Sequence, residues 1–240
     1  YDGTNLIGWQ ENQDGSSVQS LLQDAIFQFC GERVTVFSAG RTDAGVHAVN
    51  MVAHFDLEKE QEPETVTRAM NFYLTEKPVA VLNCEKVSDD FHSRFSCLAR
   101  HYKYVVINRS SPVVLQKNRA WWVPQKLDIN AMKTAAQKLV GKHDSTPFRA
   151  AQCQSKSPIK TLDSVSITQS GDEIIFEFSA RSFLHHQVRN MVGTLVEIGM
   201  GKPYDIDEIF AAKNRSAAGI NAPACGLYFV KADYPKAADL

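Results

Sequence analysis

Apolar residues recur at every third or fourth position in several segments, and this spacing predicts amphipathic helices. In the first segment Val18, Leu22 and Ile26 fall on one face, a serine at 16 or 17 can cap the start, and Gly31 can end the helix. We expect three further helices, over residues 63–74, 128–140 and 184–199.

Alternating or β-branched apolar runs lie between these helices and predict strands. They fall near residues 33–39, 47–56, 79–88, 99–109, 162–170, 173–181 and 226–233. The second part of the chain therefore has the order strand, helix, two strands, helix, strand. The first part has the same order without an opening strand, and since the chain begins at Tyr1, we expect that strand to lie in residues upstream.

This order is typical of the split βαβ, ferredoxin-like arrangement. We predict an α+β fold in which two ferredoxin-like halves, residues 1–98 and 99–240, merge into one long, mostly antiparallel sheet. All helices would then cover one face of the sheet and leave the other face open to a ligand.

Composition excludes several classes of protein. The 240 residues are 44% hydrophobic, but no apolar run approaches the roughly 20 residues that a bilayer span needs. No signal-peptide pattern opens the chain, so we expect a cytoplasmic protein. The five cysteines are scattered and lack zinc-binding spacing, which predicts reduced thiols.

Charge is distributed unevenly although the net charge is only −1. Residues 1–90 carry 6 basic and 15 acidic side chains, whereas residues 91–240 carry 20 and 12. The stretch 91–127 contains no acidic residue. This pattern indicates a surface for a polyanion, but the basic residues could equally pair with the acidic first part.

The segment SAGRTDAGVHA, residues 38–48, joins two predicted strands through a tight loop. Gly40 and Gly45 bracket Arg41, Thr42 and Asp43, so the loop presents a carboxylate. The spacing alone is explained more simply by an Asx-type turn closed by Asp43.

The eight-residue run GRTDAGVH, at 40–47, has more specific content. Together with DDFHSRFS at 89–96, ARHYKY at 99–104 and FLHHQVRNMVG at 183–193, it resembles the bacterial tRNA pseudouridine synthase A family. The resemblance extends over nearly the whole chain, from YDGTNLIGWQ to GLYFVKADYP.

This resemblance implies a reaction and the residues that perform it. Asp43 would be the nucleophile that attacks a uridine of tRNA, and Arg189 would pair with Asp43 and keep the carboxylate charged. Tyr102 would stack on the target base, and Leu227 would line its pocket. Arg41 would fill the space left in the RNA stem by the flipped base.

The resemblance also implies partners. The substrate would be the anticodon stem-loop of tRNA, modified at positions 38, 39 and 40, and the enzyme would be a homodimer. The implied RNA contacts are His92, Arg94, Arg100, Gln152 and Lys156. No cofactor is implied, and we assign no metal because the adjacent histidines 185 and 186 lack the i, i+4 spacing of a helical metal pair.

Two other functions compete with this interpretation. A non-catalytic domain that binds structured RNA would use the same basic face without needing an aspartate and arginine pair. An aspartyl-phosphate phosphatase is suggested by YDGT at residues 1–4, although the first aspartate of the D-x-D-G-T loop is absent. Magnesium dependence separates the phosphatase from the other two.

Overall fold

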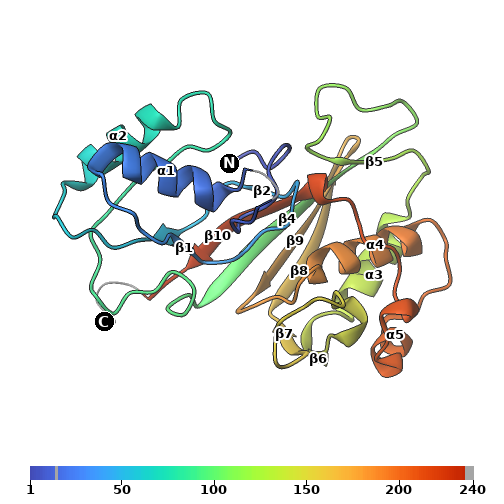
Figure 1. Ribbon diagram of the computed structural model, residues 1–240. Helices are drawn as coiled ribbons and strands as arrows, with labels where there is room; N and C mark the ends of the chain where they lie inside the picture. The colour runs from blue at the N-terminus through green and yellow to red at the C-terminus, as the bar shows by residue number, and fades with distance from the viewer. Residues whose placement is uncertain (14–15, 236–240) are drawn as a thin grey trace. The chain divides into compact units, whose positions relative to one another are not determined.

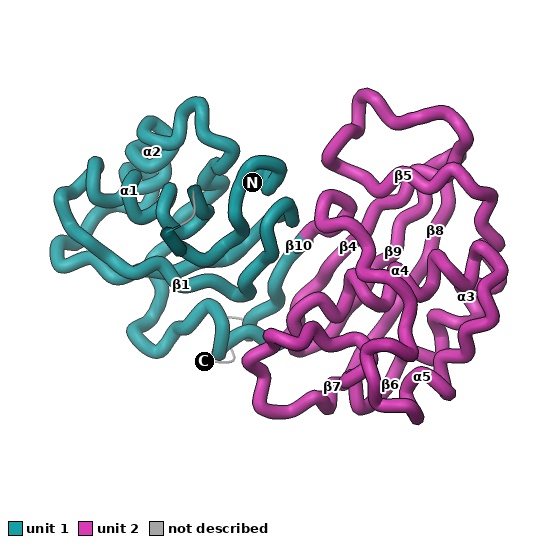
Figure 2. Tube along the Cα trace, turned by 45° about the vertical axis from the view of Figure 1, so that its right-hand side comes forward, with its two compact units in different colours: residues 1–98, 229–240 teal, residues 99–228 magenta. Residues whose placement is uncertain are grey.

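The computed structural model describes residues 1–13 and 16–235, which form a mixed α+β fold (Figure 1). The chain divides into two compact units, shown in different colours in Figure 2. Unit 1 consists of residues 1–98 and the end of the chain from Phe229, and unit 2 consists of residues 99–228. In the described part of the chain, no helix has the length and apolar character needed to cross a bilayer.

Unit 1 is built around two helices that pack on each other. Its elements are α1 (Val18–Cys30), β1 (Phe37–Ser38), β2 (His47–Ala48), β3 (Ala53–His54), α2 (Pro63–Tyr73) and most of β10 (Leu227–Asp233). β1 pairs antiparallel with β3, and β2 lies next to β10. Helices α1 and α2 bury Leu22, Ile26, Val66 and Met70 in a shared core.

The ends of α1 follow from its sequence. The Ser17 side chain accepts a hydrogen bond from the Ser20 N–H, and the Ser20 side chain accepts one from the Ser17 N–H, which forms a capping box. Gly31 ends the helix in the left-handed region, with φ 78°. The predicted start, stop and buried face of this helix are therefore confirmed.

Unit 2 has longer and more regular elements. They are β4 (Ala99–Asn108), β5 (Trp121–Val123), α3 (Ile129–Gln137), β6 (Gly141–Asp144), β7 (Ile159–Leu162), β8 (Ser164–Ser170), β9 (Glu173–Ala180), α4 (Gln187–Gly199) and α5 (Ile206–Ala212). β9 lies between β4 and β8 and is antiparallel to both, whereas β5 runs parallel to β4. The sheet is thus mostly antiparallel.

Helix α4 is buried around most of its circumference. Its apolar residues Val192 and Leu195 are inaccessible, and the polar side chains of Asn190 and Thr194 are buried with them. Asn190 donates to the Phe148 carbonyl and the Thr194 hydroxyl donates to the Asn190 carbonyl, so burial leaves their donors paired. Helix α3 packs on both α4 and β8.

The strand predicted over residues 79–88 is wrong, because that segment has no regular secondary structure. Its apolar residues do bury, since Val79, Val81 and Cys84 pack against the core of unit 1. The backbone of Val81, however, pairs with the side-chain amide of Asn71 and not with a strand. The strands predicted over 33–39 and 47–56 shorten to the two-residue strands β1, β2 and β3.

Candidate active site

The loop 38–48 of unit 1 presents Asp43 in a tight turn between β1 and β2. The Val46 N–H donates to the Asp43 carbonyl at 3.1 Å, and Gly45 takes φ 79°, which a side chain would disfavour. Asp43 is half-buried, Thr42 is buried and Arg41 is exposed. The loop thus exposes a guanidinium next to a partly shielded carboxylate.

The first nine residues of the chain hold this loop in place. Gly8 forms an antiparallel bridge with Asp43, and the Trp9 N–H donates to the Thr42 carbonyl at 3.0 Å. Gly8 has φ 107°, and a Cβ there would lie 2.5 Å from the Thr42 carbonyl oxygen. The Tyr1 and Thr42 hydroxyls are also hydrogen-bonded, at 2.8 Å. The two segments YDGTNLIGW and GRTDAGVH therefore form one local structure.

Asp2, the residue that suggested a phosphatase, has a structural role. Its carboxylate accepts hydrogen bonds from the backbone N–H and the hydroxyl of Thr4. It also lies 3.1 Å from Nδ1 of His47, which is buried and accepts the Gly3 N–H. These contacts close the turn at residues 2–4 onto β2.

In unit 2, strand β4 carries Tyr102 and a second tyrosine, Tyr104. Tyr102 is half-buried, and its ring meets the Phe183 ring edge-on with centroids 5.1 Å apart. Tyr104 is fully buried and its hydroxyl donates to the Pro223 carbonyl at 2.6 Å. Burial raises the pKa of Tyr104 well above its usual range, so this phenol stays protonated. Tyr104 therefore belongs to the core of unit 2.

Arg189 lies in the first turn of α4, where its guanidinium is fixed by backbone. Its Nε donates to the Ala222 carbonyl at 2.8 Å, and the Ala222 N–H returns a bond to the Arg189 carbonyl at 3.2 Å. Gly193, one turn further along α4, allows the backbone at Ile220 to approach the helix closely, since a Cβ at residue 193 would lie 1.8 Å from the Ile220 carbonyl oxygen. Helix α4 and the segment around 220–222 therefore orient this arginine together.

Leu227 begins β10 next to this segment and is buried. The preceding Gly226 packs on the Tyr104 ring, and a Cβ at residue 226 would lie 2.5 Å from that ring. Burial raises the pKa of the neighbouring Cys225 thiol, and Arg189 offsets part of that effect. All five cysteines of the chain lie in the described ranges and are free thiols, as predicted.

The helix predicted over residues 184–199 begins later, at Gln187, so His185 and His186 precede it. His186 is the residue before the helix and has φ 64°, a left-handed conformation that is uncommon for a non-glycine residue. The His185 and His186 rings lie 4.0 Å apart. The assignment of no metal stays a prediction.

The expected RNA contacts lie in both units. His92 and Arg94 belong to the loop 91–96 of unit 1, where Arg94 is exposed and His92 is half-buried. Arg100, in β4, is buried and donates to the Arg181 carbonyl, which leaves little of its guanidinium for RNA. Gln152 and Lys156 are exposed in the loop between Phe148 and β7.

Sequence analysis did not identify the residue that shapes this last loop, Arg149. One of its terminal nitrogens donates to the carbonyls of Cys153 and Ser155, each at 2.7 Å. Burial raises the pKa of the Cys153 thiol, but hydrogen bonds from His185, Ser155 and Arg149 outweigh it and the net pKa is lowered. A lone arginine in a polar segment carries no periodic signal that could have predicted this role.

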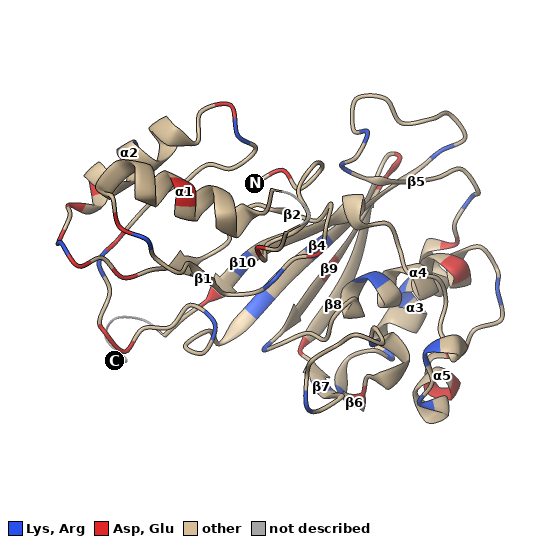
Figure 3. Ribbon diagram, in the orientation of Figure 1, with Lys and Arg blue, Asp and Glu red and all other residues tan. Residues whose placement is uncertain are grey.

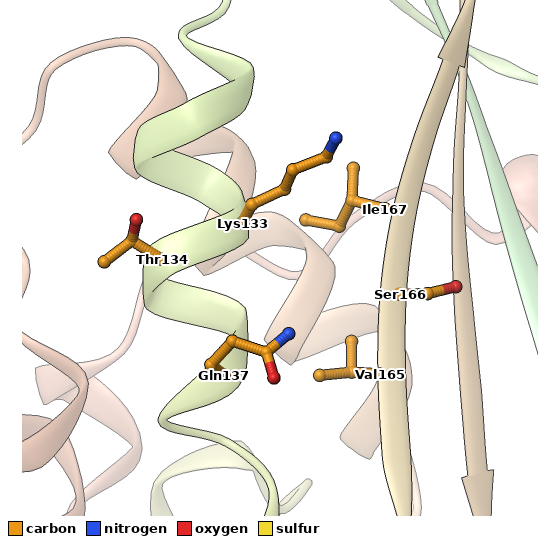
Figure 4. A pocket seen from close by; sticks show the side chains of 6 residues that line it. All are labelled: Lys133, Thr134, Gln137, Val165, Ser166 and Ile167. Atoms are coloured by element: carbon orange, nitrogen blue, oxygen red, sulfur yellow. The ribbon is translucent and has the colours of Figure 1, made fainter.

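Basic residues without acidic neighbours in sequence also mark the loop between β4 and β5 (Figure 3). Arg109, Lys117 and Arg119 lie in it, and residues 109–120 include no acidic residue. A separate shallow pocket of about 380 Å³ lies between α3 and β8, lined by residues such as Lys133, Gln137 and Ile167 (Figure 4). None of the predicted site residues lines it.

Comparison with known proteins gives one consistent result. The family model described as tRNA pseudouridine synthase matches residues 1–96 and 135–235. A protein of Rhodospirillum centenum named tRNA pseudouridine synthase A is 54% identical over 236 residues, covering 98% of this chain and 96% of the relative. Proteins with that name from Paramagnetospirillum magneticum and Azorhizobium caulinodans are 49% and 50% identical, each covering 98% of this chain and 92% of the relative.

Proposed function

The chain belongs to the tRNA pseudouridine synthase family, and we propose that it isomerises uridine to pseudouridine at positions 38, 39 and 40 of the tRNA anticodon stem-loop. The observation that carries this proposal is the tight turn of GRTDAGVH, residues 40–47, whose backbone is hydrogen-bonded to the N-terminal segment. It presents Asp43 on backbone that is fixed by Gly8 and Trp9. A nucleophile needs this kind of preorganised position.

The proposed reaction conserves every atom of the nucleotide. The Asp43 carboxylate attacks the uridine at C6 of the base or C1′ of the ribose, and the N1–C1′ bond breaks. The uracil turns, the C5–C1′ bond forms, C5 loses its proton and N1 gains one, and Asp43 is released. No electron is gained or lost, so the reaction consumes neither a redox cofactor nor a co-substrate.

Residues of both units take the other proposed roles. Arg189 keeps the Asp43 carboxylate ionised, and its bond to the Ala222 carbonyl supports this role because it fixes the direction of the guanidinium. Tyr102 stacks on the flipped base and assists proton removal from C5, Leu227 lines the base pocket, and Arg41 occupies the vacated stack. His92, Arg94, Gln152 and Lys156 bind the RNA backbone, and Arg100 positions β4 beside it.

We further propose a homodimeric, cytoplasmic enzyme whose two halves are ferredoxin-like. The order of elements from β4 to β10 supports the second half, since β4, α3, β8, β9, α4 and β10 follow the split βαβ order, with β5, β6, β7 and α5 as additional elements. Sedimentation in the presence and absence of tRNA tests the oligomeric state.

The decisive experiment measures pseudouridine in unmodified tRNA, with chelator present, for the wild type, Asp43→Ala and the isosteric Asp43→Asn. We expect product with the wild type and none with either variant, because neither can form the covalent adduct. Asp24→Asn is the matched control, since Asp24 is an exposed carboxylate of α1, and should be fully active.

Binding of the same tRNA separates the rival functions. Both Asp43 variants should bind nearly as well as the wild type, and affinity should fall steeply as salt increases, because phosphate contacts dominate. A folded wild type that binds tRNA but forms no product would favour the non-catalytic RNA-binding domain. Activity that chelator abolishes would count against a cofactor-free isomerase.

A further inference from the structure

Four aromatic rings form a continuous cluster on unit 1, outside the residues proposed to act on the target base. We refer to Phe37, His54, His92 and Phe95 as the aromatic platform. Phe37 stacks on His54 with centroids 5.1 Å apart and planes inclined by 21°. His54 lies 4.6 Å from His92, and His92 lies 4.3 Å from Phe95.

Hydrogen bonds hold the platform in one conformation. Nδ1 of His92 accepts the N–H of Arg94 at 3.1 Å, and Nδ1 of His54 accepts the N–H of Ser93 at 3.2 Å. The Tyr234 hydroxyl donates to the Ser93 carbonyl at 2.6 Å. Each of these bonds reaches its ring through Nδ1, so the backbone of residues 93–94 fixes the orientation of both imidazoles. The platform is therefore built before any ligand binds.

The outer end of the platform faces solvent. The Phe95 side chain is 72% exposed, and Phe37 at the other end is 43% exposed. The Arg94 guanidinium lies 5.8 Å from the Phe95 ring centroid. An exposed aromatic ring next to a guanidinium is the combination that binds unpaired nucleobases, since the ring stacks and the cation attracts the phosphate backbone.

The basic residue of the platform loop favours nucleic acid over an apolar protein partner. Arg94 lies between His92 and Phe95, and residues 91–98 of unit 1 contain no acidic residue, although Asp56 acts on His54 at the inner part of the platform. A purely apolar partner would gain nothing from Arg94, whereas an RNA strand would contact it together with Phe95. Phe37 precedes Asp43 by six residues, which limits their Cα separation to about 22 Å.

We propose that the aromatic platform binds an unpaired nucleobase of the tRNA by stacking on Phe95, at a site distinct from that of the isomerised uridine. The proposal rests on the proposed function, because it takes tRNA as the ligand. The stacked base anchors the stem-loop while another nucleotide is flipped out. Its contribution is therefore to binding and not to the chemical step.

The test compares Phe95→Ala, Phe95→Leu and Phe95→Tyr in tRNA binding and in steady-state kinetics. Phe95→Ala should raise the Kd and KM for tRNA by about 5- to 150-fold, as one stacked base predicts, with kcat at saturating tRNA unchanged. Phe95→Tyr should retain wild-type affinity, and Phe95→Leu should weaken it, because leucine keeps apolar bulk but lacks an aromatic face. Phe72→Ala is the control, since Phe72 of α2 is 73% exposed and lies outside the platform.

The outcomes separate this inference from the proposed function. A wild type without pseudouridine formation would overturn the proposed function, whatever the variants do. An active wild type whose Kd is unchanged by Phe95→Ala would overturn the platform alone. Sedimentation of the same samples tests whether the platform binds a second copy of the chain instead of RNA. If Phe95→Ala weakens tRNA binding and also abolishes a dimer, the platform is a dimer contact and the inference is overturned.

Discussion

The two units hold their candidate residues in different ways. In unit 1 the strands around Asp43 have two residues each, and the loop depends on a few backbone contacts made at Gly8 and Trp9. In unit 2, Arg189 projects from a buried helix and Tyr102 from a ten-residue strand. Contacts concentrated at one point are easily lost without unfolding the rest, whereas a defect in a buried helix affects the whole unit. Substitutions in unit 1 should therefore reduce activity first, and those in unit 2 should reduce stability first.

The largest effect on stability is expected for Gly193→Ala in α4. Alanine improves helix propensity by about 1 kcal/mol, but its Cβ would lie 1.8 Å from the Ile220 carbonyl oxygen. Overpacking of this kind costs about 1–3 kcal/mol and occasionally more. Because the clash is with backbone, we expect the upper end of this range and a net loss of about 2 kcal/mol after the gain in propensity, measured by urea denaturation of the whole chain.

Gly199→Ala is the control in the same helix. There the Cβ would meet the flexible end of the Met132 side chain at 2.8 Å, so a smaller loss is expected. Equal stability of both variants would show that the segment near Ile220 moves away at little cost, and that unit 2 is not held by this close contact.

The next effect is expected for Gly8→Ala in unit 1. Gly8 has φ 107° and its Cβ would lie 2.5 Å from the Thr42 carbonyl oxygen, so the bridge to Asp43 should open. Strain at such a position costs about 1–3 kcal/mol. We expect pseudouridine formation to fall at least tenfold while tRNA binding persists.

Gly31→Ala provides the comparison, because Gly31 also has a positive φ, 78°, but its Cβ would meet nothing within 4 Å. It should lose a similar amount of stability from strain and retain its activity. If both variants kept full activity, the turn at Asp43 would not depend on the N-terminal segment.

Sequence patterns predicted best where local signals and tertiary packing agree. The capping serine, the apolar face and the terminal glycine of α1 were all predicted from the sequence. The strands β4, β8 and β9 lie where alternating apolar and polar residues predicted strands. Residues 79–88 show the opposite case. Their apolar side chains bury, but the partner of Val81 is the Asn71 side chain, which a pattern of burial cannot predict.

The candidate site was predictable in part for a similar reason. Glycines around residues 41–43 indicated a loop that exposes Asp43, and this follows from local backbone preferences. That Gly8 and Thr42 pack against each other depends on residues 34 positions apart, for which a single sequence gives no local signal. The start of α4 at Gln187 was missed because His186, in a left-handed conformation, interrupts an otherwise helical pattern.

The smallest effect concerns pH and the aromatic platform. Burial lowers the pKa of His54, and the neighbouring His92 lowers it further, whereas Asp56 partly opposes both. With a lowered folded pKa, the unfolded chain takes up the proton first as the pH falls, so His54 contributes stability above its ordinary pKa of about 6.5 and loses it below. Protonation would also break the bond that Nδ1 accepts from the Ser93 N–H.

His54→Asn keeps an acceptor near the position of Nδ1 but cannot titrate, so its melting temperature should fall less between about pH 7.5 and pH 5.5 than that of the wild type. Hydrogen exchange of the Ser93 amide should show the same difference locally, and identical pH dependence in the two proteins would mean that His54 does not couple protonation to the fold of this loop.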